Sequence, residues 1–98
     1  MKSQALQLYR TILRVHRQLP KEFKELGNLY VKTEFKAHKS VTDKAVIMEF
    51  LYRWTEYKNS IVNQLKQEMT LKGAKIDLDS LSDEQIIQLN ELREEIKK

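Results

Sequence analysis

Glycine and proline are nearly absent from this chain of 98 residues, and their few positions limit what it can fold into. The sequence contains one proline, Pro20, and two glycines, Gly27 and Gly73. Tight turns and hairpins depend on these residue types, whereas the interiors of long helices exclude them. With 41% hydrophobic and 33% charged residues, a chain with so few breakers favours an all-α fold. Its length allows one domain with one modest core.

The first helix is expected over residues 3–18, with Ser3 as its N-terminal cap. Its apolar residues recur at steps of three and four, which is the spacing of one helix face. Two such rows make the apolar stripe wide: Ala5-Leu8-Ile12-Val15-Leu19 and Leu6-Tyr9-Leu13-His16.

Pro20 predicts a corner and the start of a second helix over residues 21–38. Proline disfavours helical geometry in the residue before it and is tolerated in the first turn of a helix. Gly27 lies in the middle of this helix and makes helix formation less favourable by about 1 kcal/mol relative to alanine. The usual reason for such a glycine is that a neighbouring helix approaches closely, and here we expect the first helix. The buried face of the second helix is expected to consist of Phe23, Leu26, Tyr30 and Phe35.

A long third helix is expected over residues 43–71. Ser40, Thr42 and Asp43 provide a start signal, and Gly73 fits the position after the last turn. The predicted core face of this helix is Ile47, Phe50, Leu51, Trp54, Ile61, Leu65 and Met69.

The remaining residues predict an acidic connector and a final helix. The sequence Ser82-Asp83-Glu84-Gln85 has the spacing of a capping box, in which the first and fourth side chains each bond the other's backbone N–H. The helix that follows is expected to end near Ile96 and to have a narrow apolar stripe, Ile86-Leu89-Leu92 or Arg93-Ile96. Residues 1–72 are therefore predicted to form an antiparallel three-helix bundle, and residues 73–98 an acidic connector and an additional C-terminal helix of the same domain.

Basic residues form two rows within this pattern. Residues 1–72 carry 14 Lys and Arg against 7 Asp and Glu, whereas residues 73–98 carry 4 against 7. Spacings of four and three residues place the members of each row on one helix face: Arg10, Arg14 and Arg17 on the first helix, Lys32, Lys36 and Lys39 on the second. Neither row contains an acidic residue, so an acidic partner would explain them. A solvated polar face would explain them as well, and both interpretations remain open.

Several functional classes find little support in the residues. Cysteine is absent, and His16 and His38 lack the spacing of metal ligands, so no metal site is expected. No catalytic motif is present, and the chain is not expected to be an enzyme. No run of about 18 apolar residues suggests a membrane span. Most aromatic residues fall on predicted core faces, which argues against a nucleic-acid surface. Residues 1–19 are basic, acid-free and amphipathic like a mitochondrial presequence, and the sequence leaves targeting open.

A longer pattern of residues is more specific than any of these features. Leu8-Tyr9-Arg10 resembles the tripeptide of the LYR-motif family, and Phe35 stands where that family has a downstream phenylalanine. The sequence is similar to the succinate dehydrogenase assembly factor 3 branch of this family in several further blocks: His16-Arg17-Gln18-Leu19-Pro20, Leu26-Gly27, Tyr30-Val31-Lys32, Glu34-Phe35, His38-Lys39, Trp54 and Asp83-Glu84-Gln85-Ile86.

The resemblance implies a non-catalytic, chaperone-like protein of the mitochondrial matrix that helps mature the iron-sulfur subunit of succinate dehydrogenase. It also implies the mitochondrial acyl carrier protein as a partner, whose acyl-phosphopantetheine would enter the bundle, with no cofactor of the chain's own. By matching position, Arg10, Lys36 and Lys39 would contact the carrier, and Tyr9 and Phe35 would support the bundle or line the acyl tunnel. The full set of expected partner-binding residues is Leu8, Tyr9, Arg10, Arg14, Lys32, Phe35, Lys36 and Lys39.

Two alternatives from other classes remain. The chain could be an LYR-type accessory subunit of another respiratory or iron-sulfur complex, which would expose a large apolar patch when isolated. It could also be a small basic helical protein that binds nucleic acid, with affinity that falls steeply as salt is added.

Overall fold

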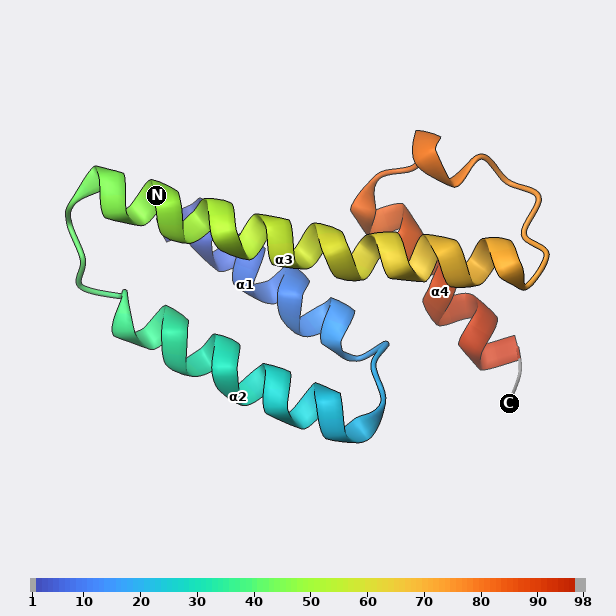
Figure 1. Ribbon diagram of the computed structural model, residues 1–98, viewed down its shortest axis with the longest axis horizontal. Coiled ribbons are helices and arrows are strands. Elements are labelled where there is room, and N and C mark those ends of the chain that lie inside the picture. The colour runs from blue at the N-terminus through green and yellow to red at the C-terminus, as the bar shows by residue number, and fades with distance from the viewer. Residues whose placement is uncertain (1, 97–98) are drawn as a thin grey trace. The chain divides into compact units, whose positions relative to one another are not determined.

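The computed structural model describes residues 2–96, and all regular structure within them is helical. The α-helices are α1 (Lys2–His16), α2 (Lys21–Ala37), α3 (Lys44–Leu71) and α4 (Asp83–Ile96), and a short 3₁₀ helix, η1, covers Leu78–Ser80. Figure 1 shows the three long helices of the first two thirds of the chain and the connector that leads to α4. The predicted all-α class is confirmed.

The chain forms two compact units, residues 1–58 and residues 59–98. Helix α3 contributes its first half to unit 1 and its second half to unit 2. The expected grouping of residues 1–72 apart from 73–98 stays a prediction.

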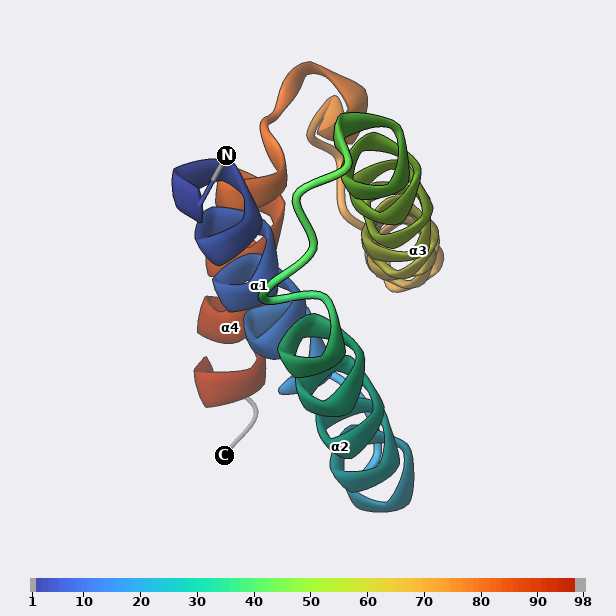
Figure 2. The same ribbon diagram turned by 90° about the vertical axis from the view of Figure 1, so that its left-hand side faces the viewer.

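Unit 1 is a three-helix arrangement around one apolar cluster. Its centre consists of Ile12 from α1, Val31 from α2, and Phe50 and Trp54 from α3. Half-buried side chains pack around this centre from all three helices: Leu8, Tyr9, Leu13, Phe35, Leu51 and Tyr57. Figure 2 shows the loop between α2 and α3 in front, with the helices of unit 1 running away behind it. Trp54, 7% exposed, lies in the core as predicted.

Helices α1 and α2 are antiparallel and joined by a tight corner. Arg17, Gln18 and Leu19 follow α1 with backbone bonds to the third residue before each. Helix α1 therefore ends two residues earlier than expected. Pro20 precedes α2 rather than lying in its first turn, and its carbonyl accepts the backbone N–H of Lys24 at 2.9 Å.

At Gly27 helix α1 approaches α2 closely, as predicted. A Cβ atom at Gly27 would lie 2.9 Å from Cε1 of His16, a distance that real Cβ contacts do not reach. The His16 ring therefore occupies the space that a side chain at position 27 would need.

The predicted buried face of α2 is wrong in three of its four residues. Phe23, Leu26 and Tyr30 are 64%, 67% and 59% exposed, whereas Val31 is fully buried and Phe35 is half-buried. The row that faces the core runs through Gly27, Val31 and Phe35, each one helical turn from the next. The apolar residues Phe23, Leu26, Leu29 and Tyr30 instead form an exposed surface, called here the outer face of α2.

The other helix ends follow local chemistry. Asp43 caps α3, because its Oδ1 accepts the backbone N–H of Ala45 at 2.9 Å, which confirms the start predicted there. Ser3 is not a cap, since α1 begins at Lys2.

Leu6, expected in an apolar row of the first helix, is exposed.

Gly73 terminates helix α3, as predicted. This glycine has a φ of 93°. The N–H of Ala74 bonds the carbonyl of Met69, and the N–H of Gly73 bonds that of Thr70, both at 3.0 Å. This pair of bonds is the Schellman arrangement, which satisfies carbonyls that the helix leaves unpaired and favours glycine for its positive φ.

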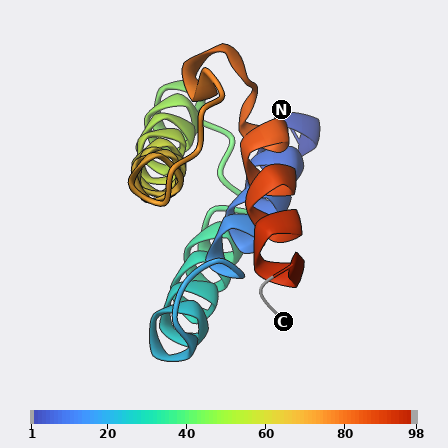
Figure 3. The ribbon, with the colours of Figure 1, turned by 90° about the vertical axis from the view of Figure 1, so that its right-hand side faces the viewer.

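Unit 2 continues through the connector into α4, which Figure 3 shows in orange and red. The predicted capping box at the start of α4 is present. The Ser82 N–H donates to Oε1 of Gln85 at 2.9 Å, and the Gln85 N–H donates to Oγ of Ser82 at 3.2 Å. The buried apolar residues of unit 2 are Ile61, Val62, Leu65 and Met69 in α3, Leu78 in η1, and Ile86 and Ile87 in α4.

The buried stripe of α4 differs from the one expected. Ile86, Ile87 and Asn90 are buried, Leu89 is half-buried, and Leu92 is 56% exposed. Ile87 was not part of the expected stripe, and α4 buries it together with Ile86. The side chain of Ile96 lies outside the described residues.

Candidate partner-binding face

The apolar members of the expected site pack in the core of unit 1. The Tyr9 and Phe35 rings lie with centroids 5.2 Å apart, so α1 and α2 bring these two residues together. Phe35 also contacts the Phe50 and Trp54 rings of α3 at 4.8 and 5.6 Å. Leu8, Tyr9 and Phe35 therefore support the bundle and offer only part of their surface to a partner.

The basic members of the expected site lie mainly on the surface. Arg10, Lys32, Lys36 and Lys39 are exposed, and Arg14 is half-buried. These four exposed residues form no ion pair with any other described residue. Ion pairs occur elsewhere, between Arg53 and Glu49 at 2.9 Å and between Lys66 and Asp79 at 3.6 Å.

The antiparallel register of α1 and α2 determines which segments of the two helices lie side by side. His16 near the end of α1 bonds Asn28 in the first half of α2, and Tyr9 contacts Phe35 in its second half. The segment of α1 with Arg10 therefore runs beside the segment of α2 with Lys32 and Lys36. We call Arg10, Lys32, Lys36 and Lys39 the basic face of unit 1.

A buried histidine links the three helices of unit 1. His16 of α1 is fully buried, and its Nδ1–H donates to Oδ1 of Asn28 in α2 at 2.7 Å. Its Nε2 accepts the hydroxyl of Tyr57 in α3, also at 2.7 Å. Burial lowers the pKa of His16, and the bond to Asn28 opposes this effect in part. The lowered pKa favours the neutral ring, which needs one donor and one acceptor partner as found here.

Sequence reasoning missed this network, although a signal for it existed. His16 lies in an apolar row of the first helix, and Gly27 predicts a close neighbour on the second. Together these features point to a ring packed against the glycine. Burial of Tyr57 raises the pKa of its hydroxyl, which keeps it protonated as the donor to His16.

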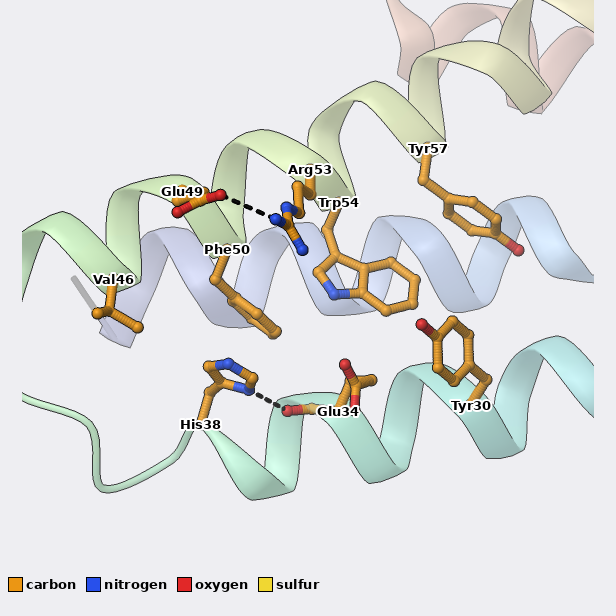
Figure 4. A pocket seen from close by; sticks show the side chains of 9 residues that line it. All are labelled: Tyr30, Glu34, His38, Val46, Glu49, Phe50, Arg53, Trp54 and Tyr57. Carbon is orange, nitrogen blue, oxygen red and sulfur yellow. Dashed lines mark hydrogen bonds and ion pairs between the residues drawn. The ribbon is translucent and has the colours of Figure 1, made fainter.

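Unit 1 also contains a cavity of about 360 Å³ between α2 and α3. Five ring-bearing side chains line it, which Figure 4 shows from close by: Tyr30, His38, Phe50, Trp54 and Tyr57. Glu34, Glu49 and Arg53 add charged groups. The sequence pattern assigned Trp54 to the core, and the structure adds that the same residue lines this cavity.

No group of three or more potential metal ligands occurs among the described residues. None of the described helices is long and apolar enough to cross a membrane.

Comparison with known proteins places these features in a family. The sequence model of a family described as Complex1_LYR-like matches residues 5–88. A protein of Kluyveromyces lactis named "Succinate dehydrogenase assembly factor 3, mitochondrial" is 47% identical over 90 residues, which cover 92% of this chain and 68% of the relative. Proteins with the same name are 47% identical in Candida albicans, over 95% of this chain and 75% of the relative, and 42% identical in Saccharomyces cerevisiae, over 95% and 68%. No solved structure matches the chain.

Proposed function

The chain belongs to the Complex1_LYR-like family, and from this premise we propose that it is a mitochondrial assembly factor for succinate dehydrogenase. Relatives of that name at 42–47% identity over more than nine tenths of the chain support the proposal. An assembly factor acts by binding, so the proposal assigns the protein no catalytic role.

The observation that carries the proposed mode of action is the basic face of unit 1. Exposed cations on two adjacent helices, without internal ion pairs among the described residues, suit an acidic protein surface. We propose that the client is the iron-sulfur subunit of the enzyme, held in the mitochondrial matrix before it joins its complex. The protein would cover the client and hold no metal itself.

We further propose that the mitochondrial acyl carrier protein binds at the same face. Arg10, Lys36 and Lys39 would meet its acidic surface, with Arg14 and Lys32 beside them. The acyl-phosphopantetheine of the carrier would then reach the bundle near Leu8, Tyr9 and Phe35, and it is the only cofactor that the proposal involves.

The proposal predicts the effect of reversing three charges on the basic face. Changing Arg10, Lys36 and Lys39 to Glu should abolish co-purification with the iron-sulfur subunit and the acyl carrier protein, because like charges across an interface cost several kcal/mol. Stability should change little, since exposed substitutions usually cost under about 0.5 kcal/mol each. Affinity capture followed by mass spectrometry, with a thermal melt, measures both effects.

A matched control applies the same charge change elsewhere. Lys44, Lys72 and Lys75 are exposed and lie outside the basic face. Changing these three to Glu should leave capture of both partners intact. If the basic-face variant folds normally and still recovers both partners, the face is a solvated surface and the proposed mode of action is wrong.

Complementation tests the assembly role itself. A yeast strain without its own succinate dehydrogenase assembly factor 3 should regain succinate dehydrogenase activity when this chain is directed to its mitochondria. The charge-reversed variant should fail. Recovery of the chain in equal amounts with a mature respiratory complex would instead indicate an accessory subunit.

A further inference from the structure

The walls of the cavity between α2 and α3 are aromatic and hold one another in place. Trp54 contacts Tyr30 at a centroid distance of 5.4 Å and Tyr57 at 5.1 Å. His38 stacks on Phe50 at 4.0 Å with 24° between the planes, and its Nδ1–H donates to the Glu34 carbonyl at 2.8 Å. These contacts fix the positions of the rings that line the cavity. Aromatic faces attract cations, and tryptophan does so most strongly.

The charge of the cavity differs from that of the unit around it. Residues 1–58 contain 12 Lys and Arg against 6 Asp and Glu, whereas Glu34, Glu49 and Arg53 line the cavity. Arg53 is paired with Glu49, but Glu34 forms no ion pair with any described residue. Figure 4 shows the Glu34 side chain rising from α2 toward α3, between His38 and Tyr30. An unpaired carboxylate beside aromatic faces suits a cationic occupant.

The rim of the cavity indicates that the occupant belongs to a polypeptide. Tyr30 and Val46 line the cavity and are 59% and 42% exposed. Tyr30 also belongs to the outer face of α2, which continues from the rim through Leu26 and Phe23. Exposed apolar residues next to a pocket are typical of sites that a protein partner covers.

We propose that the cavity receives an arginine side chain of a partner polypeptide, whose neighbouring apolar residues cover Tyr30 and the outer face of α2. Arginine fits better than lysine, because its planar guanidinium stacks on aromatic rings and forms paired hydrogen bonds to a carboxylate. Trp54 would supply the stacking surface and Glu34 the carboxylate. This proposal rests on the proposed function only in that the polypeptide would be part of the client. The site is distinct from the basic face, which would bind acidic groups.

Trp54 is the single tryptophan of the chain, so its fluorescence reports on the cavity directly. The probes are two capped peptides, Ac-Leu-Ala-Arg-Ala-Leu-NH₂ and the same peptide with citrulline in place of arginine. Citrulline keeps the shape of arginine without its charge. The arginine peptide should change Trp54 fluorescence saturably and bind about tenfold more tightly than the citrulline peptide, as expected for a charge-assisted contact.

Two variants of the full chain sharpen this test. Glu34→Gln should bring the two peptides to equal affinity, because it removes the carboxylate and keeps the size of the side chain. Glu25→Gln makes the same change at an exposed position of α2 outside the cavity and should preserve the tenfold difference. The comparison of the two peptides on the unmodified protein needs no variant and so stands even if Glu34→Gln folds poorly.

Three outcomes would overturn the proposal. They are equal affinity for both peptides, no saturable response up to about 1 mM peptide, and displacement of the arginine peptide by octanoate, which would indicate an apolar or anionic occupant. The result is independent of complementation in yeast. A chain that binds the arginine peptide but restores no succinate dehydrogenase activity would refute only the proposed function, and the converse would refute only the arginine site.

Discussion

At the level of single residues, Gly27 and His16 determine how closely α1 and α2 pack. Alanine at position 27 would raise helix propensity by about 1 kcal/mol. Its Cβ would also lie 2.9 and 3.0 Å from Cε1 and Nε2 of His16, whose ring is held by Asn28 and Tyr57. We expect Gly27→Ala to lower the free energy of unfolding by about 1–3 kcal/mol, because overpacking outweighs the gain in propensity. Urea denaturation measures this loss.

A double-mutant cycle identifies the cause of that loss. In a His16→Ala background the ring is gone, and Gly27→Ala should then be neutral or stabilising. An equal loss in both backgrounds would show that the ring is not the obstacle.

His16 also predicts how stability depends on pH. Its pKa is lowered in the folded protein, so the unfolded chain takes up the proton first as the pH falls. The stability that the neutral ring contributes is therefore complete above about pH 6.5, its ordinary pKa, and is lost as the pH falls below that value toward the folded pKa. Denaturation at pH 7.5 and at pH 5 should show a smaller free energy of unfolding at the lower pH. The difference should shrink in His16→Gln, and an equal difference in that variant would assign the effect to other groups.

At the level of elements, Gly73 tests how α3 ends. Its φ of 93° is strained for any residue with a Cβ, and no atom lies within 4 Å of the position that a Cβ would take. The cost of Gly73→Ala should therefore come from the backbone alone and amount to about 1–2 kcal/mol. Gly73→Asn should cost less, because asparagine tolerates a positive φ better. Hydrogen exchange of the backbone amides in the last turn of α3 measures the loss in each variant. Equal protection in the unmodified protein, Gly73→Ala and Gly73→Asn would contradict the prediction.

The helices themselves could be predicted closely from the sequence, because their ends depend on local chemistry. Pro20, Gly73 and the Ser82–Gln85 box act within a few residues, and α2, α3 and α4 begin and end within one residue of the expected positions. The buried face of α2 could not be read in the same way. Both of its sides carry large apolar residues at helical spacing, and only the position of the neighbouring helices decides between them.

One residue of α2 did indicate which face of the helix is buried. Gly27 was expected to face the first helix, and Val31 and Phe35 follow it at intervals of one turn. That row is the buried one. The close approach expected at Gly27 therefore indicated the buried face of α2 better than the large side chains of Phe23 and Leu26 did. The contact between Tyr9 and Phe35 also joins two residues of the expected site, but the role of the site in binding stays a prediction.

At the level of the whole molecule, stability depends on the aromatic cluster around Trp54. This side chain is 7% exposed and contacts Tyr30, Phe35, Phe50 and Tyr57. We expect Trp54→Ala to remove about 3–5 kcal/mol of stability, because the remaining rings cannot collapse into the space. Circular dichroism under denaturant measures the change. A loss under about 1 kcal/mol would show that Trp54 serves mainly the cavity and not the core.

The outer face of α2 has a consequence for the life of the protein in the cell. Four large apolar side chains on one helix, each more than half exposed, form the kind of surface that chaperones and proteases of the quality-control system recognise. A copy without a client exposes this surface continuously, whereas in a bound copy the client covers it. Copies that bind no client should therefore be degraded faster, and the amount of client, rather than the rate of synthesis, should set the level of this protein.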